Sequence, residues 1–259
     1  MIPGGSMHEY LQLDPHYDIY FLSDPHGQYA LLQDVLKEVG FRYPLDGEIR
    51  DRLFILGDMI DRGPDSMAIL KAVQDCPAIY AIQGNHEQMA CSAMKDNADR
   101  SLWIMNGGRW HEDVAIADVR KMLDFAANLP LCYTLQINGH RIGLVHAAVP
   151  APCDWQQFTQ CCNDRTLSKE DQYYAVWDRT VFTHDEHSVV SHIDAVLMGH
   201  NIVSGLKAKV SGNRVYIDGA MSMGDRGLLL KYRRGGEVLG LFQVFSFLRE
   251  ESTDGLMWI

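Results

Sequence analysis

The chain has 259 residues, of which 47% are hydrophobic and 22% charged, and this composition can bury a sizeable core in one large domain or two small ones. Its formal net charge of −11 argues against broad binding to nucleic acid or to an anionic membrane surface, because both need a cationic face. A small anionic substrate is compatible with this charge, since a bound divalent metal can reverse its sign locally.

Cysteine usage and hydropathy favour a cytoplasmic protein. The six cysteines could form disulfides, but the chain is large and shows no secretory signal, so reduced cysteines are the better interpretation. No run of apolar residues approaches the roughly 18 that a membrane span requires. Residues 1–6 resemble an expression scar with Met7 as the native start, and we interpret residues 7–259 as a single domain.

The first half of the chain repeats one unit three times: a short apolar strand, a polar loop and a helix. The predicted strands cover residues 18–22, 53–56 and 79–82. Apolar residues at helical spacing follow, as in Leu31, Val35 and Val39, where Gly40 ends the helix. Units of about thirty residues in this order predict βαβ architecture with a parallel sheet.

The second half is predicted to be rich in strands. A helix over 116–126 precedes two strands, 132–137 and 141–145, joined by a hairpin turn at Asn138-Gly139. Residues 151–192 have no clear period and are interpreted as a loop-rich insertion with one or two short helices. The remaining predicted strands cover 195–198, 206–210, 215–218, 228–232 and 238–247, the last two joined across Gly235-Gly236.

Residues that can bind metal stand where these strands end. They are Asp24, His26, Asp58, Asn85, His86, His146 and His200. Open α/β sheets bind ligands just beyond the carboxyl ends of their strands. Carboxylate, imidazole and amide groups together suit Mn, Fe or Zn better than they suit an all-oxygen Mg or Ca site.

Two such ions could share one carboxylate, and Asp58 is the natural bridge because it lies between the other ligands in the chain. In the same loop, Asp61 and Arg62 could serve a phosphate. Each residue alone has an ordinary interpretation: Asn85 could be a turn or helix-cap residue, and His146 a core histidine. Separate structural roles of this kind do not explain why five strand ends each carry a residue that can bind metal. We therefore predict metal binding.

These motifs, in this order, resemble the phosphoprotein phosphatase family of metallophosphoesterases, and most closely the bacterial and bacteriophage lambda-type serine/threonine protein phosphatases. The resemblance covers about residues 16–232 and includes Asn-His-Glu-Gln-Met at 85–89, Asn-Gly-Gly-x-Trp at 106–110 and Leu-Pro at 129–130. It implies an α/β protein with the calcineurin-like metallophosphoesterase fold. That fold is a central β-sandwich of mixed sheets flanked by helices, built from βαβ units with a β-rich C-terminal part.

The resemblance implies a binuclear metal centre of two divalent ions, Mn²⁺ in the first place, with Fe or Zn as alternatives. It divides the ligands into two sets that share one carboxylate. The first set is Asp24, His26 and Asp58, and the second is Asp58, Asn85, His146 and His200.

The remaining implied roles concern the phosphate. His86 would protonate the leaving oxygen, oriented by Asp61, and a general acid is useful because an alkoxide is a poor leaving group. Arg62 and Arg179 would bind the phosphoryl oxygens, which a bidentate guanidinium suits well. The implied activity is hydrolysis of phosphoserine and phosphothreonine in proteins or peptides, with phosphotyrosine and small aryl phosphates as further substrates, by in-line attack of a hydroxide that bridges the metals.

Departures from the family pattern surround the expected pocket and bear on substrate preference more than on metal binding. They are Ser23 for a usual Gly, Ala148 for a frequent acidic residue, Asn201 for Thr, and a shortened segment at Asp218–Ala220. In addition, Pro25 predicts extended backbone at Asp24.

Three alternative functions can be compared with phosphatase activity at particular positions of the sequence. A symmetrical dinucleoside tetraphosphate hydrolase of the same fold tends to carry Ala at the position of Asp61 and Asp at that of Glu87. A calcineurin-like phosphodiesterase would carry a second histidine where Ile202 stands. A non-catalytic scaffold that recognises phosphorylated partners would have no need of His86, Asp61 and Arg62.

Overall fold

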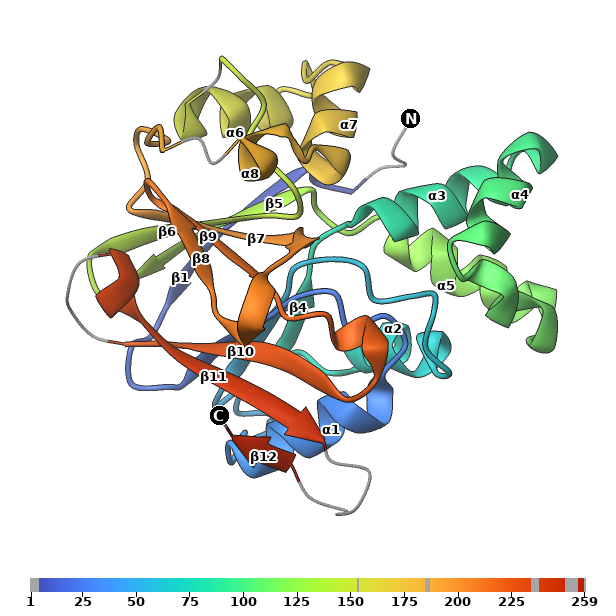
Figure 1. The fold of residues 1–259 in the computed structure, drawn as a ribbon, viewed down its shortest axis with the longest axis horizontal. Helices are drawn as coiled ribbons and strands as arrows, with labels where there is room; N and C mark the ends of the chain where they lie inside the picture. The colour runs from blue at the N-terminus through green and yellow to red at the C-terminus, as the bar shows by residue number, and fades with distance from the viewer. Residues whose placement is uncertain (1–4, 153, 185–186, 234–237, 250–255, 259) are drawn as a thin grey trace.

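Two mixed sheets pack face to face at the centre of the molecule (Figure 1). The computed structural model describes residues 5–152, 154–184, 187–233, 238–249 and 256–258. Among them, the first sheet has the order β12-β11-β10-β2-β3-β4 and the second the order β1-β5-β6-β7-β9-β8. The sandwich expected from the resemblance is therefore confirmed.

The parallel part of the first sheet comes from the βαβ units. Its strands are β2 (Ile19–Leu22), β3 (Arg52–Ile55) and β4 (Ile79–Ala81). Three later strands extend it in antiparallel fashion: β10 (Arg226–Tyr232), β11 (Phe242–Arg249) and β12 (Leu256–Trp258). All three parallel strands therefore deliver their carboxyl ends to the same edge.

The second sheet combines parallel and antiparallel pairs. Its strands are β1 (His8–Leu13), β5 (Cys132–Ile137), β6 (His140–Val145), β7 (Ala195–Ile202), β8 (Lys209–Ser211) and β9 (Arg214–Asp218). β6, β7 and β9 run parallel to one another, so the ends of β6 and β7 also meet at one edge.

Alternation along the strands builds the layers. In β2, Ile19 and Phe21 face the other sheet, whereas Tyr20 and Leu22 face the helices. The helices over the first sheet are α1 (Tyr29–Glu38), α2 (Ser66–Asp75), α3 (Asn85–Ala93), α4 (Asn97–Met105) and α5 (Ile116–Ala126). Those over the second are α6 (Trp155–Asn163), α7 (Lys169–Trp177) and α8 (Thr180–Thr183).

The prediction of a loop-rich segment over 151–192 was wrong in degree, because α6, α7 and α8 all lie within it. Local caps start two of them. The Asp154 carboxylate accepts a hydrogen bond from the Gln157 backbone N–H at 2.8 Å, and the Ser168 hydroxyl accepts one from the Asp171 N–H at 3.0 Å.

Two further differences concern strands. β1 was not predicted, yet it pairs in parallel with β5 over its whole length. Residues 206–210 do not form one strand, because a 3₁₀ turn over 204–206 precedes β8. Likewise, a 3₁₀ turn over 238–241 precedes β11, and the predicted Gly235-Gly236 turn lies outside the described residues.

Two expectations about sulfur and membranes can be compared with the structure. The five cysteines that it describes are free, as predicted for reduced thiols. In the described ranges, no helix has the length and apolar character needed to cross a membrane.

The contact between the two sheets generates a stability prediction. Phe21 is fully buried there and stacks on Phe54 at a ring-centroid distance of 5.8 Å. Phe21→Ala should lower the free energy of unfolding by about 3–5 kcal/mol, because it leaves a cavity in the sandwich. Tyr10→Ala, at a position on β1 that is 54% exposed, is the control. Urea denaturation that gives equal losses for both variants would contradict this packing.

Candidate metal centre and active site

The candidate site lies where strands of both sheets end. The loops after β2, β3 and β4 supply residues from the first sheet, and the end of β6 supplies His146 from the second. His200 differs from the prediction, because it lies within β7 and not after it. The register of β7 against β9 shifts between Met198 and Ile202, so His200 sits in a bulge that turns its side chain to the site.

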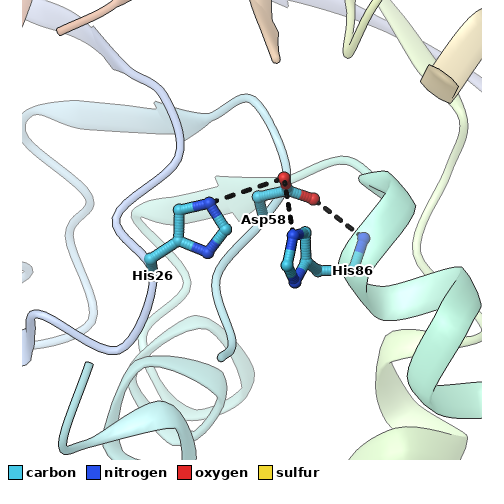
Figure 2. Close-up of side chains that lie close together, drawn as sticks. All are labelled: His26, Asp58 and His86. Atoms are coloured by element: carbon cyan, nitrogen blue, oxygen red, sulfur yellow. Dashed lines mark hydrogen bonds and ion pairs between the residues drawn. The ribbon is translucent and has the colours of Figure 1, made fainter. Parts of the chain in front are cut away.

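One group of buried side chains surrounds Asp58 Oδ2. His26 Nε2 lies 3.6 Å from this oxygen and His86 Nε2 lies 3.9 Å from it. Figure 2 shows both imidazoles directed at the carboxylate, His26 from the loop after β2 and His86 from the first turn of α3. One ligand atom from each of the three residues lies within 4.8 Å of the others, a spacing that could hold an ion.

A second group surrounds the other oxygen of the same carboxylate. His146 Nε2 lies 3.4 Å from Asp58 Oδ1 and 3.0 Å from the Asn85 side-chain oxygen. Asp58, His146 and His200 together have ligand atoms within 4.8 Å of one another. The two groups share only Asp58, the arrangement that a bridging carboxylate needs.

Asp24 belongs to neither of these groups. Its buried carboxylate accepts a hydrogen bond from the His200 backbone N–H at 3.0 Å and one from the Ser23 hydroxyl. The expectation of extended backbone was wrong, since Asp24 has φ of 52°. The left-handed conformation turns the carboxylate toward β7, and burial raises its pKa well above the usual range.

Backbone carbonyls hold the imidazoles through the ring nitrogen that faces away from the site. His26 Nδ1 donates to the Ile60 carbonyl at 2.9 Å, and His146 Nδ1 donates to the Leu56 carbonyl at 2.6 Å. His200 Nε2 donates to the Trp177 carbonyl at 3.1 Å. Since a carbonyl can only accept, the other nitrogen of each ring is directed into the site, the usual arrangement around metal-ligating histidines.

The protonation of these histidines fits a cation site. Burial lowers the pKa of His26 and of His200 to about 3, so both are neutral at pH 7. Burial also disfavours the charged form of His146, but the Asp58 carboxylate outweighs it and raises the His146 pKa to about 10. A positive charge, whether a proton or a metal ion, is therefore favoured beside Asp58. Together, two carboxylates, three imidazoles and an amide oxygen are a donor set that suits a borderline divalent ion.

His86 is held differently from the other imidazoles. Its Nδ1 lies 2.6 Å from Asp61 Oδ2, and Asp61 also accepts from the indole N–H groups of Trp103 at 2.9 Å and Trp110 at 2.7 Å. Burial lowers the pKa of His86, but the charge of Asp58 and the hydrogen bond with Asp61 raise it more. Neither tryptophan was assigned a role at the site by the sequence analysis.

Glu87 is a residue of the site that the sequence analysis did not predict. Its buried carboxylate accepts hydrogen bonds from the backbone N–H groups of Asp58 at 2.9 Å, Met59 at 2.8 Å and Gly84 at 2.8 Å. It therefore joins the loop after β3 to the loop after β4. Burial and the charge of Asp58 raise the pKa of Glu87 to about 7.

The two predicted phosphate-binding arginines lie on opposite sides of the site. Arg62 Nη1 lies 2.9 Å from His26 Nε2 and Arg62 Nη2 lies 3.1 Å from His86 Nε2, so the guanidinium lies between the two rings. Arg179 donates through Nη1 to the His200 carbonyl at 2.8 Å and to the Asn201 side-chain oxygen at 3.1 Å. Asn201, a departure from the family pattern, thus contacts a predicted site residue directly.

Left-handed backbone is concentrated in these loops. The site residues with positive φ are Asp24, His26, Asp58, Asp61, Arg62 and His200. Such conformations are unfavourable for residues other than glycine and recur at functional sites. Gly84 permits the close approach of Asp58, because a Cβ at that position would lie 2.2 Å from Asp58 Oδ1.

Comparison with curated proteins finds relatives of two kinds. Serine/threonine-protein phosphatase 2 of Escherichia coli (strain K12) is 24% identical over 81% of this chain and 91% of its own length. Serine/threonine-protein phosphatase 1 of Salmonella typhimurium is 28% identical over 70% of this chain and 77% of its own. A symmetrical bis(5'-nucleosyl)-tetraphosphatase of Dechloromonas aromatica is 28% identical over 44% of this chain and 39% of its own.

Comparison with solved structures supports the fold. A serine/threonine phosphatase from Saccharomyces cerevisiae aligns with a TM-score of 0.64 at 14% identity, over 96% of this chain and 86% of that one. The family model of the calcineurin-like phosphoesterases matches residues 17–215, which include every residue of the two Asp58 groups. The chain is therefore a metallophosphoesterase of the calcineurin-like phosphoesterase family.

Proposed function

We propose that this chain is a metal-dependent phosphomonoesterase that hydrolyses phosphoserine and phosphothreonine in proteins or peptides. The observation that carries the proposal is the buried Asp61–His86 pair at 2.6 Å, with Arg62 beside it. This arrangement combines a candidate proton donor with a phosphate-binding cation at the edge of a metal-binding cluster. The two relatives matched over most of their length are named as serine/threonine phosphatases, which favours the same substrate class.

The residues proposed to hold one ion are Asp24, His26 and Asp58, and those for the other are Asp58, Asn85, His146 and His200. Mn²⁺ is the proposed metal, with Fe or Zn as alternatives. When bound, such ions polarise phosphoryl oxygens and lower the pKa of water. The protein's own contribution is to hold these side chains rigidly through the backbone carbonyls behind three of the rings.

His86 is assigned to proton donation and not to metal binding. Its Nδ1–H is held by Asp61, so Nε2 is the atom that would pass a proton to the leaving oxygen. Asp61 is fixed in turn by two indole N–H groups, which leave the carboxylate no freedom to rotate. Since His86 Nε2 lies 3.9 Å from Asp58 Oδ2, the distinction between acid and ligand needs an experiment.

Arg62 and Arg179 are assigned to the phosphoryl oxygens. Arg62 already lies within hydrogen-bond distance of His86, the proposed acid, and so could bind a phosphate whose leaving oxygen faces that ring. Arg179 approaches from the helical insertion, next to His200. Phosphate bound between them would contact the loop after β3 and the helical insertion.

Hydrolysis of symmetrical dinucleoside tetraphosphates is the second candidate, because a relative with that name matches part of the chain. That match extends over less than half of each protein. The residue pair by which the sequence separates the two groups, Asp61 and Glu87, makes specific contacts here, to His86 and to the loop after β3. A phosphoprotein-binding scaffold is a third possibility that only turnover can exclude.

Activity on three substrates with added Mn²⁺ would test the proposal. We expect the protein to hydrolyse a phosphoserine peptide and p-nitrophenyl phosphate with a higher kcat/KM than a dinucleoside tetraphosphate. A preference for the dinucleoside tetraphosphate would support the second candidate function, hydrolysis of symmetrical dinucleoside tetraphosphates. Absence of turnover on all three substrates, with metal shown to be bound by elemental analysis, would support the scaffold.

His86→Asn should lower kcat by roughly 10²–10⁴-fold, the usual contribution of a general acid, and leave the metal content unchanged. His16→Asn, at an exposed histidine, is the matched control. Elemental analysis distinguishes the two roles of His86. Loss of metal from His86→Asn, with His16→Asn unaffected, would mean that His86 is a ligand.

Asp58→Asn should reduce the occupancy of both metal sites, because each oxygen of Asp58 faces a different group of ligands. Asp113→Asn, at an exposed position, controls for the general effect of removing a negative charge. The measurement is the metal-to-protein ratio after dialysis against a defined Mn²⁺ concentration. A ratio that falls by only one ion would rule out the bridging role.

A further inference from the structure

A groove leads away from the site between two helices. It consists of two adjacent hollows of about 420 and about 250 Å³, which lie between α7 on one side and α3 and α4 on the other. Gln88 and Ser92 of α3 line both hollows, so the two are continuous. In Figure 1, α3 and α7 belong to the two different outer layers of the sandwich.

The groove lies next to the candidate site. Trp177 lines its smaller hollow, and the Trp177 carbonyl accepts the hydrogen bond from His200 Nε2. On the opposite wall, Gln88 follows His86 by two residues on the same helix. None of the proposed metal ligands or phosphate-binding residues lines either hollow, so the groove lies beside the site, and a chain bound there by its phosphate would have room to extend into it.

The walls near the site are apolar and exposed. Tyr173 is 60% exposed and stacks on Trp177, with ring centroids 5.6 Å apart and an interplanar angle of 14°. Leu102, which is 46% exposed, lines the facing wall. Exposed aromatic and aliphatic side chains in a hollow are typical of surfaces that bind a partner.

The far end of the groove is cationic. Lys95 and Lys169 both line the larger hollow and are exposed, and within the described ranges neither ammonium group forms an ion pair. Of the acidic groups that line the groove, Glu87 accepts from backbone N–H groups and Asp99 accepts from the Ser92 hydroxyl. Three further carboxylates adjoin the lysines in the chain but line neither hollow, namely Asp96, Glu170 and Asp171. Asp96 accepts from the Ala98 N–H, and Asp171 accepts from the Ser168 hydroxyl. In a chain with a net charge of −11, this pair of lysines is an unusual local surface.

Helix geometry sets the distance from the site to the lysines. Lys169 precedes Trp177 by eight residues on α7, which corresponds to about 12 Å at 1.5 Å per residue. Lys95 follows His86 by nine residues along α3 and its cap, or about 13 Å. An extended peptide advances about 3.3 Å per residue, so either distance spans about four residues.

We infer that this groove binds the polypeptide next to the phosphorylated residue, and that Lys95 and Lys169 select substrates with acidic residues about four positions away. The inference rests on the proposed function and deepens it, since it names a sequence preference for the same site. A peptide is favoured over a nucleotide because the groove extends over two adjacent hollows, its walls contain both apolar and amide side chains, and Lys169 lies about 12 Å along α7 from Trp177.

The test compares phosphoserine peptides that differ only in charge. One carries two Glu residues three and four positions after the phosphoserine, a second carries them before it, and a third has Gln at all four positions. One of the two acidic peptides should show a KM about three- to twenty-fold lower than the Gln peptide, as two partly exposed ion pairs would produce. Added NaCl should reduce the difference.

The double variant Lys95→Gln/Lys169→Gln should remove this preference. Lys37→Gln on α1, outside the groove, should retain it. Each kcat/KM is expressed relative to the turnover of p-nitrophenyl phosphate by the same variant, so that changes in the reacting centre cancel. The effect should appear in KM, since the lysines lie far from the reacting atoms.

Three results would overturn the inference. The first is equal KM values for all three peptides with the unmodified protein, and the second is a preference that survives in the double variant. The third is a double variant with unchanged peptide kinetics but a raised KM for a dinucleoside tetraphosphate, which would assign the groove to a nucleotide. Failure of the proposed function itself looks different, because then p-nitrophenyl phosphate is hydrolysed and no phosphopeptide is.

Discussion

The site depends on one buried carboxylate that is neither a ligand nor an acid. Glu87 accepts three short hydrogen bonds from backbone N–H groups of two different loops. Without it, those N–H groups would be buried without partners, at a cost of about 1–3 kcal/mol each. Because Asp58 belongs to one of these loops and Asn85 and His86 follow the other, this single interaction sets the distance between the proposed bridging carboxylate, the proposed amide ligand and the proposed acid.

The loops around Glu87 hold the backbone in conformations that it would not adopt alone. Asp58, Asp61 and Arg62 lie within five residues and all have φ between 52° and 73°. Each such residue costs of order 1–3 kcal/mol, which the surrounding hydrogen bonds must offset. The result is that both oxygens of Asp58 and the carboxylate of Asp61 point in defined directions. The strained backbone lowers the free energy of unfolding, but it orients these charges before any substrate binds.

Much of the fold and many of the site residues could be predicted from the sequence. Most of the features that were missed depend on contacts between residues far apart in the chain. The βαβ units and the ligand types at strand ends follow from local patterns, so His26, Asp58 and His146 were found from their position after apolar runs. The roles of Glu87, Trp103 and Trp110 depend on contacts with residues 27 to 49 positions away, which no local pattern contains. The left-handed φ of Asp24 opposed the preference imposed by Pro25, and tertiary contacts decided the outcome. β1 was missed because it is an edge strand with exposed side chains such as Tyr10.

The candidate metal ligands come from both sheets, so metal binding would be coupled to folding. His26, Asp58 and Asn85 follow strands of the first sheet, whereas His146 and His200 belong to the second. An ion shared by Asp58 and His146 would therefore cross-link the two sheets of the sandwich at one edge. By mass action, the free energy of unfolding would then rise with the logarithm of the free ion concentration once this exceeds the dissociation constant. The supply of metal would govern how long the protein survives as well as how fast it reacts.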